Sequence, residues 1–145
     1  MTTVPILQRP VPTVGVVCLK GDQVLLIKRG TPPRLGQWSL PGGRIEWSET
    51  VTDAALRELK EETGVDAELI GLLDVVDGVF TSRESGAVTR HFVMIDYAAR
   101  WTRGEPVAGD DAADAAFFTR EAAMAAVEWD ETRRVIAQAF ERFAA

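Results

Sequence analysis

One segment of the chain, residues 43–65, constrains the fold more than any other. It reads GRIEWSETVTDAALRELKEETGV, with Ser48 as a candidate helix N-cap and Gly64 as a candidate C′ residue. A serine side chain accepts a hydrogen bond from the first helical turn, and glycine adopts the left-handed backbone that ends many helices. The segment therefore predicts a helix over residues 49–63. The side chains expected to face the core are those of Ala55, Leu56 and Leu59.

The predicted helix carries three acids at helical spacing. Glu58, Glu61 and Glu62 stand at i, i+3 and i+4, so their side chains share one sector of the helix. Like charges at this spacing repel, and Mg²⁺ typically binds a few carboxylates together with water and phosphate oxygens. The alternative is a solvated acidic face with Arg57 and Lys60 as partners. The acids alone leave both interpretations open.

The remaining sequence predicts strands on both sides of this helix and two helices near the end of the chain. Residues 11–19 and 24–28 are apolar and rich in β-branched side chains around a Gly21-Asp22 turn, which favours a hairpin. The other predicted strands lie at residues 38–40, 66–79, 88–99 and 115–119. The predicted helices run from a Thr119 cap to Ala126 and from an Asp130 cap to Phe143.

Length, charge and cysteine usage limit the class of protein. The 145 residues, 46% of them hydrophobic, suffice for one core and predict a single domain over residues 1–145. The net charge of −6 argues against binding to a nucleic-acid polymer, which relies on Lys and Arg. No membrane association is expected, because no apolar run is long enough for a membrane helix. The single cysteine, Cys18, lies in an apolar run and predicts a buried thiol in a cytoplasmic protein.

The full pattern of residues 43–65 resembles the Nudix box, GX5EX7REUXEEXGU, in which U is a bulky aliphatic residue. Every specified position is matched. The matching residues are Gly43, Glu49, Arg57, Glu58, Leu59, Glu61, Glu62, Gly64 and Val65. The preceding residues 38–42, WSLPG, also resemble the approach to this box. The resemblance implies an α+β fold, the Nudix α/β/α sandwich around a mixed β-sheet.

The same resemblance implies a hydrolase that cuts a phosphoric anhydride bond with Mg²⁺ or Mn²⁺ as cofactor. The implied metal ligands are Glu58, Glu61, Glu62 and the backbone carbonyl of Gly43 or of Gly42. Arg57 would orient these acids. In family members the residue equivalent to Glu49 either contacts metal through water or pairs with the arginine, and we favour the pairing.

The general base is left open by the resemblance. Family members use either the box glutamate that corresponds to Glu58 or an acid outside the box. The acids of residues 105–114 are candidates here, chiefly Asp111 and Asp114, because they precede the strand predicted at 115–119. An exposed acidic loop is the alternative for these residues. The residues expected to carry catalysis are Glu58, Glu61, Arg57 and Asp111.

The expected substrate is a small nucleotide-type molecule. The candidates for contacting it are Arg44, Arg29, Arg34 and Lys28 for a phosphate group, and Phe80, Trp47 and Trp101 for a base. Arg44 is the first choice because it directly follows the glycine pair, and Phe80 and Arg29 complete the preferred set. Each aromatic residue has core or edge packing as its alternative.

ADP-ribose is the leading substrate, because the chain resembles small bacterial-type Nudix proteins labelled ADP-ribose pyrophosphatases. One departure is that residues 79–82 read VFTS where enzymes of that kind commonly carry a proline after the box. A nucleotide-sanitising (deoxy)nucleoside triphosphate pyrophosphatase is the alternative. A non-catalytic nucleotide-sensing module is disfavoured because such modules usually lose box acids and this chain keeps them all. Whether the chain forms a homodimer is left open.

Overall fold

The structure is a computed structural model that describes residues 8–32 and 34–144. Its strands are β1 (Val11–Lys20), β2 (Gln23–Arg29), β3 (Trp38–Ser39), β4 (Gly42–Arg44), β5 (Asp66–Thr81), β6 (Val88–Arg103) and β7 (Ala112–Thr119). Its helices are α1 (Val51–Thr63), α2 (Arg120–Ala126) and α3 (Asp130–Phe143). Every predicted strand is present. The sequence does not predict β4, because two glycines and an arginine carry no apolar alternation.

The strands of the described residues form one mixed sheet organised around β1, which runs antiparallel to β2 and β4 and parallel to β6. β1 and β2 pair beside their connecting turn, through Leu19 with Val24 and Lys20 with Gln23. Further from the turn β1 pairs with β4, whereas β2 pairs with β3. On its other edge β2 pairs with β7 along its whole length. The two strands therefore diverge, and the sheet separates into two parts.

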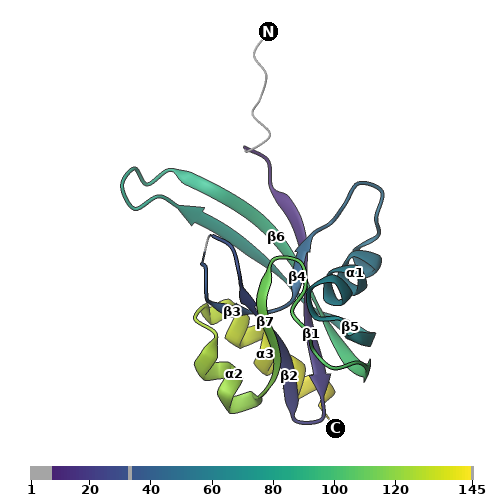
Figure 1. Cartoon of the computed structure of the whole chain (residues 1–145). Helices are drawn as coiled ribbons and strands as arrows, with labels where there is room; N and C mark the ends of the chain where they lie inside the picture. The colour runs from purple at the N-terminus through teal and green to yellow at the C-terminus, as the bar shows by residue number, and fades with distance from the viewer. Residues whose placement is uncertain (1–7, 33, 145) are drawn as a thin grey trace.

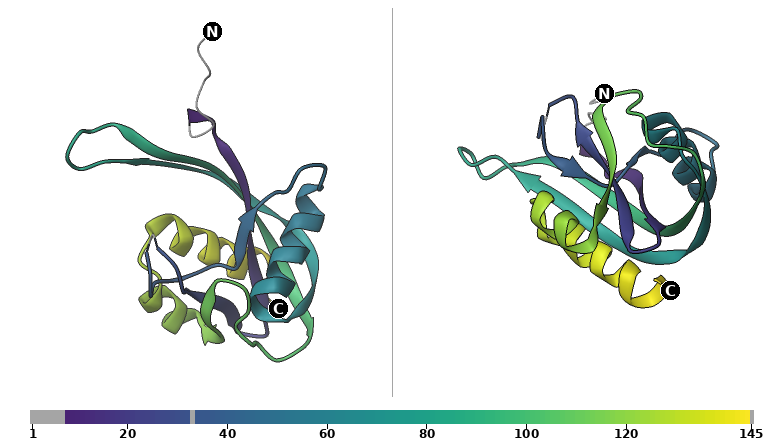
Figure 2. Two further views of the ribbon diagram at one scale, coloured as in Figure 1. Left: turned by 45° about the horizontal axis from the view of Figure 1, so that its top comes forward. Right: turned by 60° about the horizontal axis from the view of Figure 1, so that its bottom comes forward.

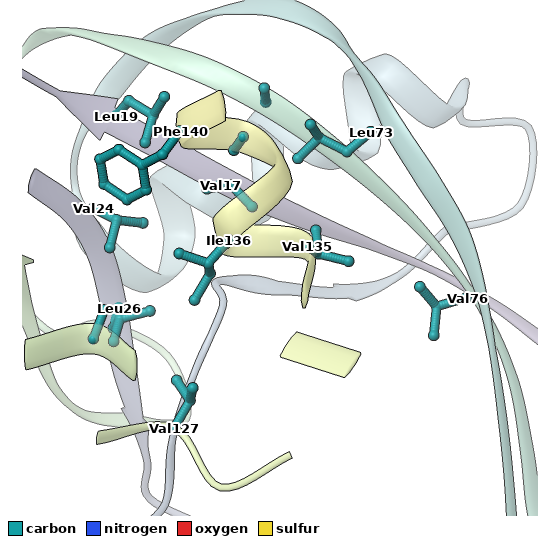
Figure 3. Close-up of a cluster of buried hydrophobic side chains, with 13 residues drawn as sticks. Val17, Leu19, Val24, Leu26, Leu73, Val76, Val127, Val135, Ile136 and Phe140 are labelled. Atoms are coloured by element: carbon teal, nitrogen blue, oxygen red, sulfur yellow. The ribbon is translucent and has the colours of Figure 1, made fainter. Parts of the chain in front are cut away.

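Helices cover both faces of this sheet, as Figures 1 and 2 show. Side chains alternate along a strand, so Val14, Val16 and Cys18 of β1 point towards α1. Val17 and Leu19 point to the other face and pack under α2 and α3. Figure 3 shows this second core, in which the α3 side chains labelled in the close-up meet those of β1 and β2. The predicted sandwich around a mixed sheet is confirmed.

β5 and β6 form a long antiparallel hairpin whose tip projects from the body of the molecule (Figure 1). The outer part of this arm pairs Val79 with His91 and Phe80 with Arg90. Because β6 also pairs with β1, the base of the arm is part of the main sheet. The arm therefore carries residues of β5 and β6 from the core to the edge of the cavity described below.

The predicted buried thiol is confirmed, because Cys18 is fully buried. Burial raises its pKa to about 12, so the thiol stays protonated at neutral pH. No helix among the described residues is long and apolar enough to cross a membrane.

The start of α1 differs from the sequence prediction. Ser48 has a positive φ of 66° in a turn in which the N–H of Glu49 donates to the carbonyl of Glu46, so it is not the N-cap. Thr50 takes that role, since its hydroxyl accepts from the N–H of Asp53 at 3.2 Å. The helix therefore begins two residues later than predicted. The other end is confirmed, because Gly64 is left-handed with a φ of 71°.

Two further predictions about helices need correction. Leu56 is exposed rather than packed in the core, because α1 turns its Ala54, Ala55 and Leu59 side towards the sheet. Asp130 lies within the first turn of α3 and pairs with Arg133, so it is not a cap. The cap predicted for α2 is confirmed, because Thr119 accepts a hydrogen bond from the N–H of Ala122.

We expect Thr50→Ala to lower the free energy of unfolding by about 1 kcal/mol, because it removes the acceptor for an N–H of the first turn. Ser48→Ala is the matched control and should change stability by no more than about 0.5 kcal/mol. Urea unfolding followed by circular dichroism measures both variants. A greater loss for Ser48→Ala than for Thr50→Ala would contradict this assignment of the cap.

Candidate active site

Arg57 is the centre of the charged cluster on α1. Its Nε and Nη2 donate to the two carboxylate oxygens of Glu49 at 2.6 and 2.9 Å. Its Nη1 donates to Glu58 at 2.8 Å and to Glu61 at 3.1 Å, and Nη2 also donates to the carbonyl of Arg44 at 3.1 Å. The favoured pairing of Glu49 with Arg57 is therefore present. The guanidinium and the N–H of Glu46 together lower the pKa of Glu49 to about 2.

Glu62 is the buried acid of the cluster, and Glu58 is partly buried. The Glu58 side chain is 12% exposed, and burial raises its pKa although Arg57 opposes the shift. Glu62 is 7% exposed and accepts the N–H of Gly42 at 2.8 Å. Burial raises the pKa of Glu62 to about 8, and repulsion from Glu58 adds to the shift. Glu61 is different, because its side chain is 45% exposed.

The glycines of β4 allow this close approach. A Cβ on Gly43 would lie 2.7 Å from the carboxyl carbon of Glu58. A Cβ on Gly42 would lie 2.0 Å from the carbonyl oxygen of Val14. Larger residues would therefore displace the Glu58 carboxylate or the β1–β4 pairing. The predicted neighbourhood of Gly43 and the helix acids is present.

The segment between β6 and β7 docks on the end of α1. The N–H of Val107 donates to the carbonyl of Thr63 at 2.9 Å, and that of Gly109 donates to the carbonyl of Glu62 at 3.0 Å. These bonds satisfy carbonyls that a helix end leaves without partners. Asp110 is thereby held close enough to raise the pKa of Glu58 and of Glu62 by charge repulsion. Asp110 lies in the acidic segment 105–114 that contains the candidate bases, but no motif in the sequence distinguishes it from the other acids there.

A cavity of about 1010 Å³ lies between the two parts of the sheet and the base of the arm. One end is lined by the carboxylates and glycines of the cluster, namely Gly42, Gly43, Glu58, Glu62, Asp110 and Asp111. The other end is lined by apolar and aromatic side chains, which include Trp38, Leu40, Phe80, Phe92, Met94 and Trp129. Five arginines of the described residues border it, namely Arg9, Arg29, Arg34, Arg44 and Arg90. The cavity thus joins an acidic end to a largely apolar one.

Most of the predicted substrate-contacting residues reach this cavity. Arg44, Arg29 and Phe80, the preferred set, line it together with Arg34. The guanidinium of Arg34 lies 4.8 Å from the ring centroid of Phe80 and 5.5 Å from that of Trp129. Burial is the main cause that lowers the pKa of Arg34, and repulsion from Arg29 and Arg90 lowers it further. A cluster of guanidinium groups borders the aromatic end.

Two aromatic candidates, Trp47 and Trp101, and the candidate Lys28 are not among the residues that line the cavity. Trp47 is 97% exposed in the loop before α1, and Trp101 donates its indole N–H to the carbonyl of Gly104. Of the two preferred outside acids, Asp111 lines the cavity, whereas Asp114 is paired within β7 opposite Lys28 of β2. Trp129 and the buried Asp96 also line the cavity and were not predicted as site residues, because their sequence positions carry no motif.

The acids of α1 are oxygen donors of the kind that a hard divalent cation binds, but their side chains do not converge on one point in this structure. Within the described ranges, no three Asp, Glu, His or Cys side chains converge as a ready metal site. Glu58 and Glu61 bond to Arg57, while Glu62 bonds to the N–H of Gly42. Burial nevertheless raises the pKa values of Glu58 and Glu62, so their ionised forms lack full compensation within the described chain. A cation with oxygen ligands would supply that compensation.

Comparison with known proteins agrees with this geometry. The model of the NUDIX domain matches residues 9–140. The ADP-ribose pyrophosphatase of Methanocaldococcus jannaschii is 39% identical over 109 residues, which cover 75% of this chain and 62% of that protein. The 8-oxo-dGTP diphosphatase of Proteus vulgaris is 38% identical over 82 residues, covering 56% of this chain and 70% of that protein.

A solved structure with the same fold is the NUDIX domain of Shewanella oneidensis NrtR, complexed with ADP ribose. It is 25% identical to this chain, with a TM-score of 0.76, and the match covers 93% of this chain and 89% of the other. The similarity extends over the sheet and both helical layers, so it is not confined to the box.

Glu62→Gln should stabilise the metal-free protein at alkaline pH. The pKa of Glu62 is about 8 in the folded protein and 4.5 ordinarily, so folding favours the protonated side chain. The stability that wild type gains from this protonation is complete below pH 4.5 and is lost as the pH rises through 8. In EDTA at about pH 9 the variant should exceed wild type by on the order of 1 to 3 kcal/mol, and the difference should vanish towards about pH 4.

The control for this prediction is Glu61→Gln, which changes a half-exposed acid of the same cluster. Its effect on stability should stay within about 0.5 kcal/mol at both pH values. Thermal and urea unfolding of the three proteins in EDTA provide the comparison. A Glu62→Gln variant that is less stable than wild type at alkaline pH would show that the Glu62 carboxylate is compensated in the fold.

Proposed function

The chain belongs to the Nudix family, and we propose that it is a metal-dependent pyrophosphohydrolase that cuts the diphosphate linkage of a nucleoside diphosphate joined to another moiety. The observation that carries this proposal is a pair of acids, the partly buried Glu58 and the buried Glu62, at one end of a large cavity. Both acids lie against the backbone of Gly42 and Gly43, where a diphosphate can approach main-chain atoms. Nothing in a stable core requires two carboxylates there.

The proposed metal ligands are Glu58, Glu61, Glu62 and the carbonyl of Gly43, with Mg²⁺ or Mn²⁺ as the cation. When bound, the cation lowers the pKa of a water molecule and offsets phosphate charge. Arg57 positions the acids, because it holds Glu58 and Glu61 while Glu49 anchors its other edge. The arginines at the cavity border, led by Arg44 and Arg29, would bind the phosphate that is not attacked.

Hydrolysis also needs a group that accepts a proton from the attacking water. Glu58 is one candidate, because burial strengthens it as a base and its carboxylate lines the cavity. Asp111 is the second candidate, and its neighbour Asp110 joins it because Asp110 is electrostatically coupled to Glu58. Substitution of each acid separates these candidates.

ADP-ribose is the proposed substrate, since the relative from Methanocaldococcus jannaschii is named an ADP-ribose pyrophosphatase. The cavity is large enough for a ligand of that size, and Phe80 offers an aromatic face for a base. The second candidate is an oxidised or normal deoxynucleoside triphosphate, favoured by the relative named 8-oxo-dGTP diphosphatase. The proposed location is the cytoplasm, because a buried, unpaired Cys18 suits a reducing compartment.

Turnover should require added Mg²⁺ or Mn²⁺ and should stop in excess EDTA. A panel of ADP-ribose, other nucleotide sugars, dinucleotides and nucleoside triphosphates, with products identified by chromatography, measures activity and substrate together. ADP-ribose should yield AMP and ribose 5-phosphate, whereas a triphosphate should yield a monophosphate and pyrophosphate. Full activity in EDTA would contradict the metal dependence.

Glu58→Gln and Glu61→Gln should each lower kcat by on the order of 10² or more, because each removes an anionic ligand or base while keeping the side chain's shape. Asp111→Asn and Asp110→Asn test the outside base, with Asp114→Asn as the control that does not reach the cavity. If neither Asp110→Asn nor Asp111→Asn changes kcat, the base is on α1.

A further inference from the structure

Asp96 is a buried carboxylate that the proposed chemistry does not use. It lies on β6, is 7% exposed and lines the cavity on the α3 side of the sheet. Its carboxylate packs on Gly15 of β1, where a Cβ would lie 2.3 Å from Oδ1. Within the described residues, no donor bonds to the carboxylate of Asp96, whose oxygens face the cavity. A buried, unpartnered carboxylate is costly unless a ligand supplies the missing donors.

The charged groups that face Asp96 do not satisfy it. Asp74, its cross-strand partner on β5, repels it, and Arg134 of α3 attracts it. Arg134 is committed elsewhere, because it donates to Asp74 and to Glu131 at 2.7 Å each. Burial, followed by repulsion from Asp74, raises the pKa of Asp96 to about 6. The carboxyl can therefore be present in either protonation state near neutral pH.

The register of the sheet determines the distance between Asp96 and the proposed diphosphate site beside the acids of α1. Gly15 pairs with Gly42 on one side and with Asp96 on the other, so Asp96 lies two strands from Gly42. With neighbouring strands about 4.8 Å apart, this separation is roughly 10 Å. The N–H of Gly42 contacts Glu62 at the proposed diphosphate site. A ribose can span that interval between diphosphate and base.

The same end of the cavity suits the flat apolar faces of a base. Leu40 lies beside Asp96 and Gly15, and Met94 precedes Asp96 on the same face of β6. Phe80 and Trp129 line the same cavity, with ring centroids 5.9 Å apart. Aromatic and apolar walls with one unsatisfied polar group are typical of a site that reads the edge of a planar ring.

We propose that Asp96 is the specificity-determining residue for the base, selecting purines whose amino group lies beside a ring nitrogen. The proposal rests on the proposed function for the position of the diphosphate. Guanine presents a ring N–H and an amino group, which together match an ionised carboxylate. Adenine presents an amino donor beside a ring nitrogen acceptor, which matches the protonated acid. An unsubstituted purine, linked to ribose through N9, has no amino group and no ring N–H, so it offers neither paired match.

Binding of AMP, GMP and purine riboside 5′-monophosphate to the EDTA-treated protein tests this, because nucleoside monophosphates bind without being cleaved. Calorimetry should show that wild type binds AMP or GMP at least about tenfold more tightly than purine riboside 5′-monophosphate, which has the same ring without the amino group. Asp96→Leu should abolish this difference and leave the binding of purine riboside 5′-monophosphate unchanged. Asp77→Leu is the control, since Asp77 is an exposed acid of β5 outside the cavity lining. Thermal unfolding checks that each variant is folded.

Asp96→Asn distinguishes the two purines. An amide can replace the protonated acid towards adenine, so AMP binding should persist, whereas the paired donors of guanine lose one acceptor and GMP binding should weaken at least about tenfold. The loss of GMP affinity caused by Asp96→Leu should become larger as the pH rises through about 6, because the ionised carboxylate binds guanine. The loss of AMP affinity should become smaller over the same range, because the protonated acid binds adenine. These opposite pH trends tell which purine Asp96 reads.

Unchanged AMP and GMP binding in Asp96→Leu, or an equal loss for AMP, GMP and purine riboside 5′-monophosphate, overturns the proposal. The outcome for the proposed function is separate. If wild type discriminates purines through Asp96 but cleaves no diphosphate in the substrate panel, the base site stands and the hydrolase proposal fails. If diphosphates are cleaved and Asp96→Leu leaves KM unchanged for every substrate, the hydrolase proposal stands and the assignment of Asp96 fails.

Discussion

The forked ion pair of Arg57 with Glu49 is the interaction on which the candidate site depends. One edge of the guanidinium is fixed by both oxygens of Glu49, so the other edge is free to hold Glu58 and Glu61 on α1. Its further bond to the carbonyl of Arg44 ties the end of β4 to the helix. Rigid bidentate donors suit this task better than a single flexible ammonium group. Without this arginine the acids of α1 would repel one another beside the glycine strand.

The cavity follows from a sheet whose central hairpin diverges. β1 and β2 pair beside their turn and then take different partners, so the space between them is bordered by strands on two sides. Gly42 and Gly43 line one end because side chains there would meet Val14 or Glu58. Gly15 makes the matching room for Asp96. Glycines at these close approaches allow acids from both faces of the sheet to reach one cavity.

The two buried acids, Glu62 and Asp96, destabilise the folded protein when they are ionised. Burial raises both pKa values, to about 8 and about 6, because neither carboxylate has enough charge compensation within the described chain. Each contributes stability in its protonated form and loses that contribution as the pH rises through its pKa in the fold. Stability and function conflict at such positions, since the charge that a ligand needs is the charge that folding disfavours.

The sequence by itself determined the helix with its Gly64 stop, the order of strands, and the set of acids on α1. Those features depend on local spacing, since helical periodicity and turn chemistry act within a few residues. Tertiary structure decided which residue caps the helix, because the turn before it gives Ser48 a left-handed backbone and leaves Thr50 to bond the first turn. It also brought Asp110 and Asp96 to the cavity. These positions follow from strand pairing and loop docking between segments far apart in the chain, and no local pattern encodes them.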